Sequence, residues 1–318
     1  MRLRRRSLAA SLAIAAAALA LACATGGLRG HGARETGLLF FWKVESPAAG
    51  GGSAHLLGSV HFGRPDFRFD PAILEGFESS DGLVMELAPE DVTPERMLAL
   101  LQEMGRLPED RTLSELLSPE AYRALAQALE RSGYSIAGLD PFEPWVSIIF
   151  LASLAVQGGG LSREEGVEAH FIERAEARLE IIGLETPEEQ MTVFDSMPLE
   201  LQEEILRGLV GEGDAFGEVT DAIVEAWLRG DSERLAELAL IGSHQDEGAK
   251  AFQQAMYLER NRKMAREIAE LIDRGGEWFV VIGAAHMVGD EGIPALLEER
   301  GYRVRQIEKT RSSTDAVD

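Results

Sequence analysis

Short apolar runs, bounded by glycine, proline or small polar residues, lie near both ends of the chain. Runs of this length and composition predict buried β-strands. They occupy residues 38–44, 54–60, 83–86, 277–282 and 302–307. Residues 46–53, between the first two runs, are rich in Gly, Ala and Ser and therefore predict a hairpin turn.

Between these terminal regions, residues 93–273 have a mainly helical pattern. Two helices are predicted to begin after Thr93 and Ser118, because each of these N-cap residues is followed by a proline at the first helical position. Residues 144–157 are apolar on nearly every side, which predicts a buried helix, and a strand is expected at 180–184. We therefore predict a mixed α/β fold (α+β mixed). Its central mixed sheet is built from N- and C-terminal strands, with a large helical middle segment packed over it.

The first residues predict an export signal rather than a part of the fold. Four arginines precede an apolar run at residues 8–21, and the small residue Ala22 precedes Cys23. A basic region, a short apolar region and a small residue before the cleavage point are typical of a secretory signal. The run is too short to span a bilayer comfortably. Because Cys23 occupies the position of the acylated cysteine of bacterial lipoproteins, we predict a lipid-anchored protein, with plain secretion or a retained anchor as alternatives.

Charge and cysteine content limit the partners and the compartment. Loss of the four signal arginines changes the formal net charge from −23 to −27, which argues against binding to nucleic acid or to anionic lipid. With one cysteine no internal disulfide can form, so the core must hold the exported domain together. We expect a protein exported to the bacterial envelope (periplasm or outer membrane) that meets the membrane only through its anchor; no oligomeric state follows.

We expect four segments along the chain. Residues 1–22 form the signal peptide, 23–36 a flexible tether, 37–310 a single domain and 311–318 a disordered tail. The tether is rich in Gly and Ala, as flexible connectors are.

Two of the predicted strands end with the same short motif. Gly58 is followed three residues later by His61, and Gly283 by His286, whereas the run at 83–86 ends in the carboxylate of Glu86. Buried strands that end in this way predict a site at the carboxyl edge of a sheet. Two His and one Glu are a common ligand set for a divalent metal. A single such His would more often be a buried structural residue, but its repeated context favours function.

Other candidate site residues lie further along the chain. Glu185 also follows a predicted strand, although its charge has the alternative role of stabilising a helix N-terminus. Arg260 and Asn261 stand inside a strongly helical stretch, where Asn is mildly unfavourable, and this predicts inward hydrogen bonding. Because the planar fork of arginine suits carboxylates, Arg260 is predicted to bond at least one of Glu86, Glu185 and Glu168.

Taken with their order and spacing, these motifs resemble the TraB/GumN family, which includes the Tiki proteases. The resemblance extends from about residue 38 to 307 and rests on blocks at residues 41–44, 57–63, 80–87, 183–190, 227–231, 259–261 and 281–289. One departure is Glu168 in Gly166-Val167-Glu168, where the family usually has Gly-x-Asp. The acid is retained but is longer by one methylene group.

The resemblance implies a metal-dependent hydrolase of the peptidase type, acting on a peptide or protein substrate. The metal ligands that it implies are His61, Glu86 and His286. The catalytic residues that it implies are Glu86, Glu185, Arg260 and Asn261. A divalent ion, with Mn, Co and Zn all plausible, would polarise a carbonyl and lower the pKa of water, while Glu86 or Glu185 would act as general base.

Other catalytic classes are disfavoured by the sequence, and two non-catalytic functions stay open. The chain has no His-Glu-x-x-His, so an ordinary zincin is excluded, and it has no Gly-x-Ser-x-Gly. The alternatives are a non-catalytic lipoprotein that binds a peptide signal, and a lipoprotein that binds haem or metal.

Overall fold

A computed structural model describes residues 32–60, 68–158, 166–175, 178–211, 215–239 and 247–310. The predicted signal peptide, Cys23, His61 and the predicted tail lie outside these ranges. Within them, no helix combines the length and the apolar character that a membrane crossing requires.

The sheet contains strands from both ends of the chain, as predicted. Its strands are β1 (Leu38–Glu45), β2 (Ser53–Ser59), β3 (Gly82–Met85), β4 (Glu180–Gly183), β5 (Glu277–Gly283) and β6 (Arg303–Glu308). They are arranged in the order β4-β3-β5-β2-β1-β6. β1 pairs antiparallel with β2 and β6, whereas β2, β5, β3 and β4 run parallel. The prediction of a mixed α/β fold is confirmed.

The parallel strands bring the two repeated motifs to one edge. β2 lies directly beside β5, with Ser59 opposite Gly283 and Gly58 opposite Ile282. The second motif therefore starts one residue later than the first in the shared register. Leu56, Leu57 and Val280 have no exposed surface, as expected for strands that are covered on both faces.

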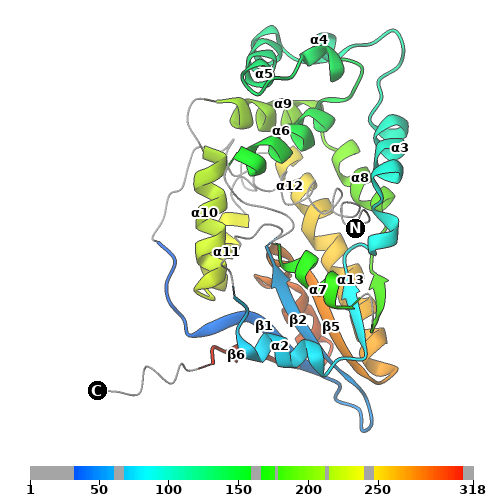
Figure 1. The fold of residues 1–318 in the computed structure, drawn as a ribbon, viewed down its shortest axis with the longest axis vertical. Coiled ribbons are helices and arrows are strands. Elements are labelled where there is room, and N and C mark those ends of the chain that lie inside the picture. The colour runs from blue at the N-terminus through cyan, green and yellow to red at the C-terminus, as the bar shows by residue number, and fades with distance from the viewer. Residues whose placement is uncertain are drawn as a thin grey trace.

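Helices fill the middle of the chain and surround the sheet (Figure 1). Those before β5 are α2 (Pro71–Glu78), α3 (Pro94–Met104), α4 (Leu113–Leu116), α5 (Pro119–Arg131), α6 (Pro144–Gly158), α7 (Val167–Ala175), α8 (Pro187–Asp195), α9 (Leu199–Val210), α10 (Ala215–Leu228), α11 (Ser232–Ala239), α12 (Glu247–Gln253) and α13 (Glu259–Asp273). α14 (Ile293–Glu299) follows β5. In Figure 1, α3 to α6, α8 and α9 lie beyond the end of the sheet toward which β2 points.

The predicted helix starts are confirmed. The Thr93 side chain accepts a hydrogen bond from Arg96 N at the start of α3, and the Ser118 side chain accepts one from Ala121 N at the start of α5. α6 carries the fully buried Trp145, as the apolar run predicted. One feature was not predicted: a π-helical turn, Gln254–Leu258, joins α12 to α13.

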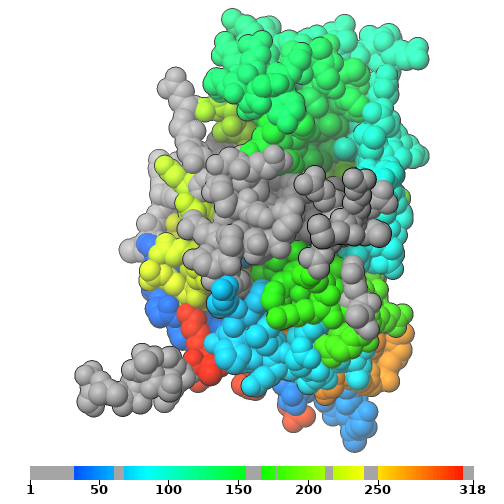
Figure 2. Space-filling model, in the orientation of Figure 1, coloured from blue at the N-terminus to red at the C-terminus, as the bar shows by residue number. Residues whose placement is uncertain are grey.

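Two hydrophobic clusters make up the core. The first joins the sheet to the helices on its faces, where the rings of Phe77 and Phe171 lie 5.0 Å apart and both contact Phe279. α2 and α7 lie in front of the sheet in Figure 1, and Figure 2 shows them side by side, α2 in cyan and α7 in green. The second cluster lies among the helices of the middle segment and contains Trp145 and Phe194. The helical segment therefore has a core of its own, next to that of the sheet.

Candidate functional site

Glu86 directly follows β3, and Glu185 lies two residues beyond the end of the neighbouring parallel strand β4. The backbone pairing continues past the strands, because Glu185 N donates to the Glu86 carbonyl oxygen at 2.8 Å. The two carboxylates consequently leave the sheet side by side, although only 6% of Glu86 and 5% of Glu185 is exposed. At the end of β5, Gly283 N donates to Glu86 Oε1 at 2.7 Å, which ties the first acid to the second repeated motif.

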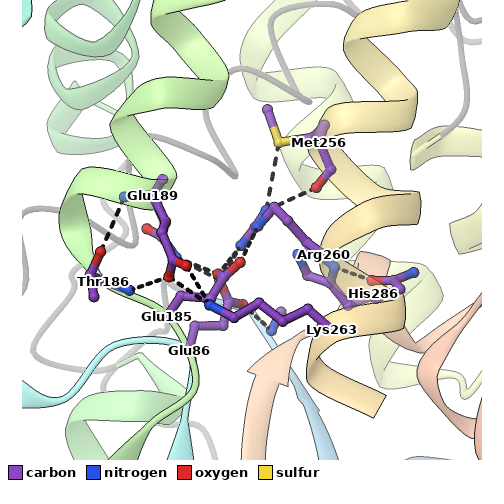
Figure 3. Close-up of polar contacts among 11 residues, drawn as sticks. Glu86, Glu185, Thr186, Glu189, Met256, Arg260, Lys263 and His286 are labelled. Atoms are coloured by element: carbon purple, nitrogen blue, oxygen red, sulfur yellow. Dashed lines mark hydrogen bonds and ion pairs between the residues drawn. The ribbon is translucent and has the colours of Figure 1, made fainter. Parts of the chain in front are cut away.

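Arg260 joins these two acids (Figure 3). Its Nε and Nη2 donate to Glu185 Oε1 and Oε2 at 2.7 and 2.6 Å, a bidentate pair. Nη2 also donates to Glu86 Oε2 at 3.0 Å, and Nη1 donates to the Met256 carbonyl oxygen at 2.9 Å. The prediction that Arg260 bonds at least one of the acids is confirmed, since it bonds two.

The charges of this group do not cancel, because two carboxylates face one guanidinium. Gln190 Nε2 donates to Glu86 Oε2 at 3.2 Å and to Glu185 Oε2 at 3.1 Å, and these hydrogen bonds stabilise the negative charge that Arg260 does not balance. Burial by itself lowers the pKa of Arg260. The hydrogen bonds and charge of Glu185, with the charge of Glu86, outweigh that effect and raise the pKa above its usual value. Arg260 is therefore a permanent cation in the interior.

The ion group lies where the two hydrophobic clusters meet. Met85 and Leu184, just before the two glutamates, belong to the cluster around the sheet, whereas Leu87, just after the first, belongs to the helical cluster. Along the Arg260 helix, Met256 belongs to the helical cluster and Met264 to the sheet cluster. The buried charges thus mark the boundary between the two parts of the core.

His286 follows β5 within a 3₁₀ turn, Ala284–Met287, and is 2% exposed. Asn261 Nδ2 donates to the Glu291 carbonyl oxygen at 2.7 Å, so the amide oxygen of Asn261 faces the imidazole. His286 Nδ1 lies 2.5 Å from that oxygen and must be the donor. In the neutral imidazole this hydrogen bond places the lone pair of the ring on Nε2, as in metal-binding histidines.

The first repeated motif is held from two sides at the end of β2. Trp227 Nε1 donates to the Gly58 carbonyl oxygen at 2.6 Å. The Ser59 hydroxyl donates to Glu168 Oε1 at 2.5 Å, and Glu168 is 5% exposed. The acid that departs from the usual Gly-x-Asp therefore bonds the strand that leads to His61. His61 itself lies outside the described residues.

A family model identifies the chain at this point: that of the TraB/PrgY/gumN family matches residues 40–306. The chain belongs to the TraB/PrgY/gumN family. The match covers both strand-end motifs, both glutamates and the Arg260 helix, in agreement with the resemblance that the motifs indicated. No curated protein and no solved structure matches the chain significantly.

The structure of this family member brings the described members of the predicted site to the carboxyl ends of the parallel strands. Glu86, Glu185 and Arg260 are bonded to one another, and Asn261, the next residue on α13, holds His286. In the ranges that the structure describes, no three His, Cys, Asp or Glu side chains converge as a metal site. Because His61 is not among them, the predicted ligand set stays a prediction.

Two residues of this region were not predicted. Gln190 bonds both glutamates, but from sequence it is one polar residue in the first turns of a helix. Tyr257 lies in the π-helical turn, with its ring 5.4 Å from that of His286. Burial raises the pKa of the Tyr257 phenol, although the charge of Arg260 opposes the shift. Only its position three residues before Arg260 could have drawn attention to it.

Proposed function

We propose that this protein is a metal-dependent hydrolase of the peptidase type, with a divalent ion bound by His286, Glu86 and His61. The observation that carries the proposal is the hydrogen-bonded chain from the Glu291 carbonyl through Asn261 to His286. That chain fixes the ring and its tautomer at the end of a buried strand. Metal-binding histidines almost always donate their other ring N–H to such a partner, which sets the orientation of the ring.

The described donors fit this use. A carboxylate offers about four lone-pair directions. Glu86 Oε2 accepts from Arg260 and Gln190, whereas among the described residues Oε1 accepts only from Gly283 N and retains a direction for one further bond. Together with His286 Nε2, Glu86 Oε1 supplies the nitrogen and oxygen donors that Zn or Mn accepts. When bound, the ion supplies Lewis-acid chemistry, polarising a carbonyl and making water acidic enough to attack near neutral pH.

The remaining residues have distinct roles in this proposal. Glu185 makes three hydrogen bonds, two of them from the Arg260 fork, so it is suited to position Arg260 and poorly suited to accept a proton. Glu86 has one direction left on Oε1, so it acts either as a ligand of the ion or, with the ion held by the two histidines, as the general base. Arg260 holds the two acids together through its hydrogen bonds, and Asn261 orients His286.

Removal of metal tests the proposal. We expect the purified mature protein to carry a divalent ion, measured by elemental analysis, and to cleave members of a peptide library. Dialysis against a chelator should abolish cleavage, and Mn, Co or Zn should restore it. Cleavage that survives complete removal of metal would contradict the proposal. Metal and peptide binding without cleavage would select the peptide-binding alternative instead.

We further propose that the protein is exported and anchored through Cys23. Cys23→Ser removes the residue that would carry the acyl chains, so the protein should move from the membrane fraction to the soluble periplasmic fraction. Its thermal unfolding should not change. Fractionation with immunodetection measures this. A wild-type protein found entirely in the soluble fraction would reject the anchor, while leaving the hydrolase proposal intact.

A further inference from the structure

The Tyr257 hydroxyl is shielded from solvent and finds no hydrogen-bond partner among the described residues. The ring is partly buried and packs at 61° to His286, a contact that phenylalanine would make equally well. Placing a hydroxyl in such a position without a partner is unfavourable, and native proteins seldom do so. The hydroxyl therefore needs an explanation that ring packing does not provide.

A second buried polar atom of the same region has the same property. Gln190 is 2% exposed, and its Oε1 has no partner in the described part of the chain. The orientation of the amide is fixed, because only its nitrogen can donate to the carboxylates of Glu86 and Glu185. Oε1 consequently points away from the acids as an acceptor.

Both residues lie close to the group around Glu86. Gln190 bonds this acid, and Tyr257 stands three residues before Arg260, which also bonds it, with its ring against that of His286. Tyr257 also lies in the π-helical turn, a distortion that often occurs at functional sites. Each residue inserted into a helix rotates the positions before it by about 100° relative to those after it. The turn thus sets the face on which Tyr257 stands relative to Arg260.

We infer that Tyr257 and Gln190 receive a secondary amide of the substrate, the hydroxyl donating to its carbonyl oxygen and Gln190 Oε1 accepting from its N–H. An amide offers both an acceptor and a donor, whereas an ester offers only acceptors. This inference rests on the proposed function and says which side chains hold the scissile amide of its substrate. It adds a catalytic residue, Tyr257, and a specificity-determining residue, Gln190, to that site.

Two tyrosine-to-phenylalanine variants separate this role from a structural one. The Tyr302 hydroxyl donates to the Ala269 carbonyl oxygen at 3.2 Å and serves as the matched control. For Tyr257→Phe we expect kcat/KM on a cleaved library peptide to fall about 100-fold, as for other donors to a reacting carbonyl. Its Tm should be unchanged or higher. For Tyr302→Phe we expect normal kcat/KM and a Tm lower by about 2–4 °C.

Either of two results would overturn the role of Tyr257: wild-type kcat/KM in Tyr257→Phe, or a loss of Tm like that of Tyr302→Phe. The depsipeptide analogue of the same peptide tests Gln190. With oxygen in place of the scissile N–H, it should compete about 10-fold more weakly, the worth of one neutral hydrogen bond. Equal competition would overturn the role of Gln190.

The two proposals fail in different ways. If the wild type cleaves peptides only with metal while Tyr257→Phe remains fully active, this inference alone is wrong. If the wild type cleaves nothing, the hydrolase proposal is wrong. Calorimetric binding of the tightest library peptide to metal-free protein then still tests the amide contacts, and Tyr257→Phe should weaken that binding about 10-fold. Unchanged binding would reject them.

Discussion

Arg260→Met is expected to lower the free energy of unfolding by about 3–5 kcal/mol, because it leaves two buried carboxylates without their cation. Glu86 and Glu185 have 7% and 2% of their side chains exposed and lie 3.0 and 2.6 Å from Arg260 Nη2, so water cannot replace the guanidinium. Urea denaturation measures the change. Stability equal to that of the wild type would show that the ion group is not buried in solution.

Arg260→Lys separates charge from geometry. Lysine keeps the cation but cannot reproduce the bidentate fork on Glu185 or reach both acids at once. We expect the fold to be retained and most of the hydrolytic activity or metal affinity to be lost. For Arg260→Met the matched control is Arg262→Met, on the same helix. Arg262 has 55% of its side chain exposed, so this variant should change the free energy of unfolding by only about 0–1 kcal/mol. A fully active Arg260→Lys variant would remove Arg260 from the mechanism.

His286→Ala is expected to have the largest effect on activity. If His286 binds the metal, its loss should remove cleavage together with most of the bound ion, measured per chain by elemental analysis. Asn261→Ala keeps the imidazole but removes the group that orients it, and should cost roughly 10- to 100-fold in metal affinity or activity. His286→Ala should therefore lose more activity and more bound metal than Asn261→Ala.

His55→Gln controls for the loss of a histidine as such. His55 lies near the start of β2, at the end of that strand away from the repeated motif, and its ring stacks on Phe41 at 5.4 Å. We expect normal metal content and activity in this variant. A His286→Ala variant that still binds the full amount of metal would contradict the proposed metal site, whether or not the variant cleaves peptides.

The strands, the two capped helices and the buried helix could be predicted because local signals are strong there: apolar runs, turn residues, and Thr93 and Ser118 before proline. The strand order could not, since it depends on pairings such as that of β3 with β5, which no local pattern specifies. Among site residues, Arg260 was predictable because it adjoins an Asn in a helix.

Gln190 and Tyr257 were not predictable, for two different reasons. Gln190 is 104 residues from Glu86 in sequence, and its partners are chosen only when α8 packs against the ends of β3 and β4. Tyr257 depends on the π-helical turn, which shifts the helical face by one residue and defeats any argument from a 3.6-residue period.

The interleaving of chain ends in the sheet has a consequence for the order of folding. β1 lies between β2 and β6, so Lys43 pairs with both His55 and Arg305, and β2 pairs with β5 through contacts such as Ser53 with Glu277. A nascent chain can close the first hairpin early, but both outer edges of that hairpin stay unpaired until β5 and β6 have been synthesised. Non-local closure of this kind is slow, whereas the helical cluster can consolidate from contacts made sooner. β5 and β6 are thus the strands that cover the two open edges of the first hairpin.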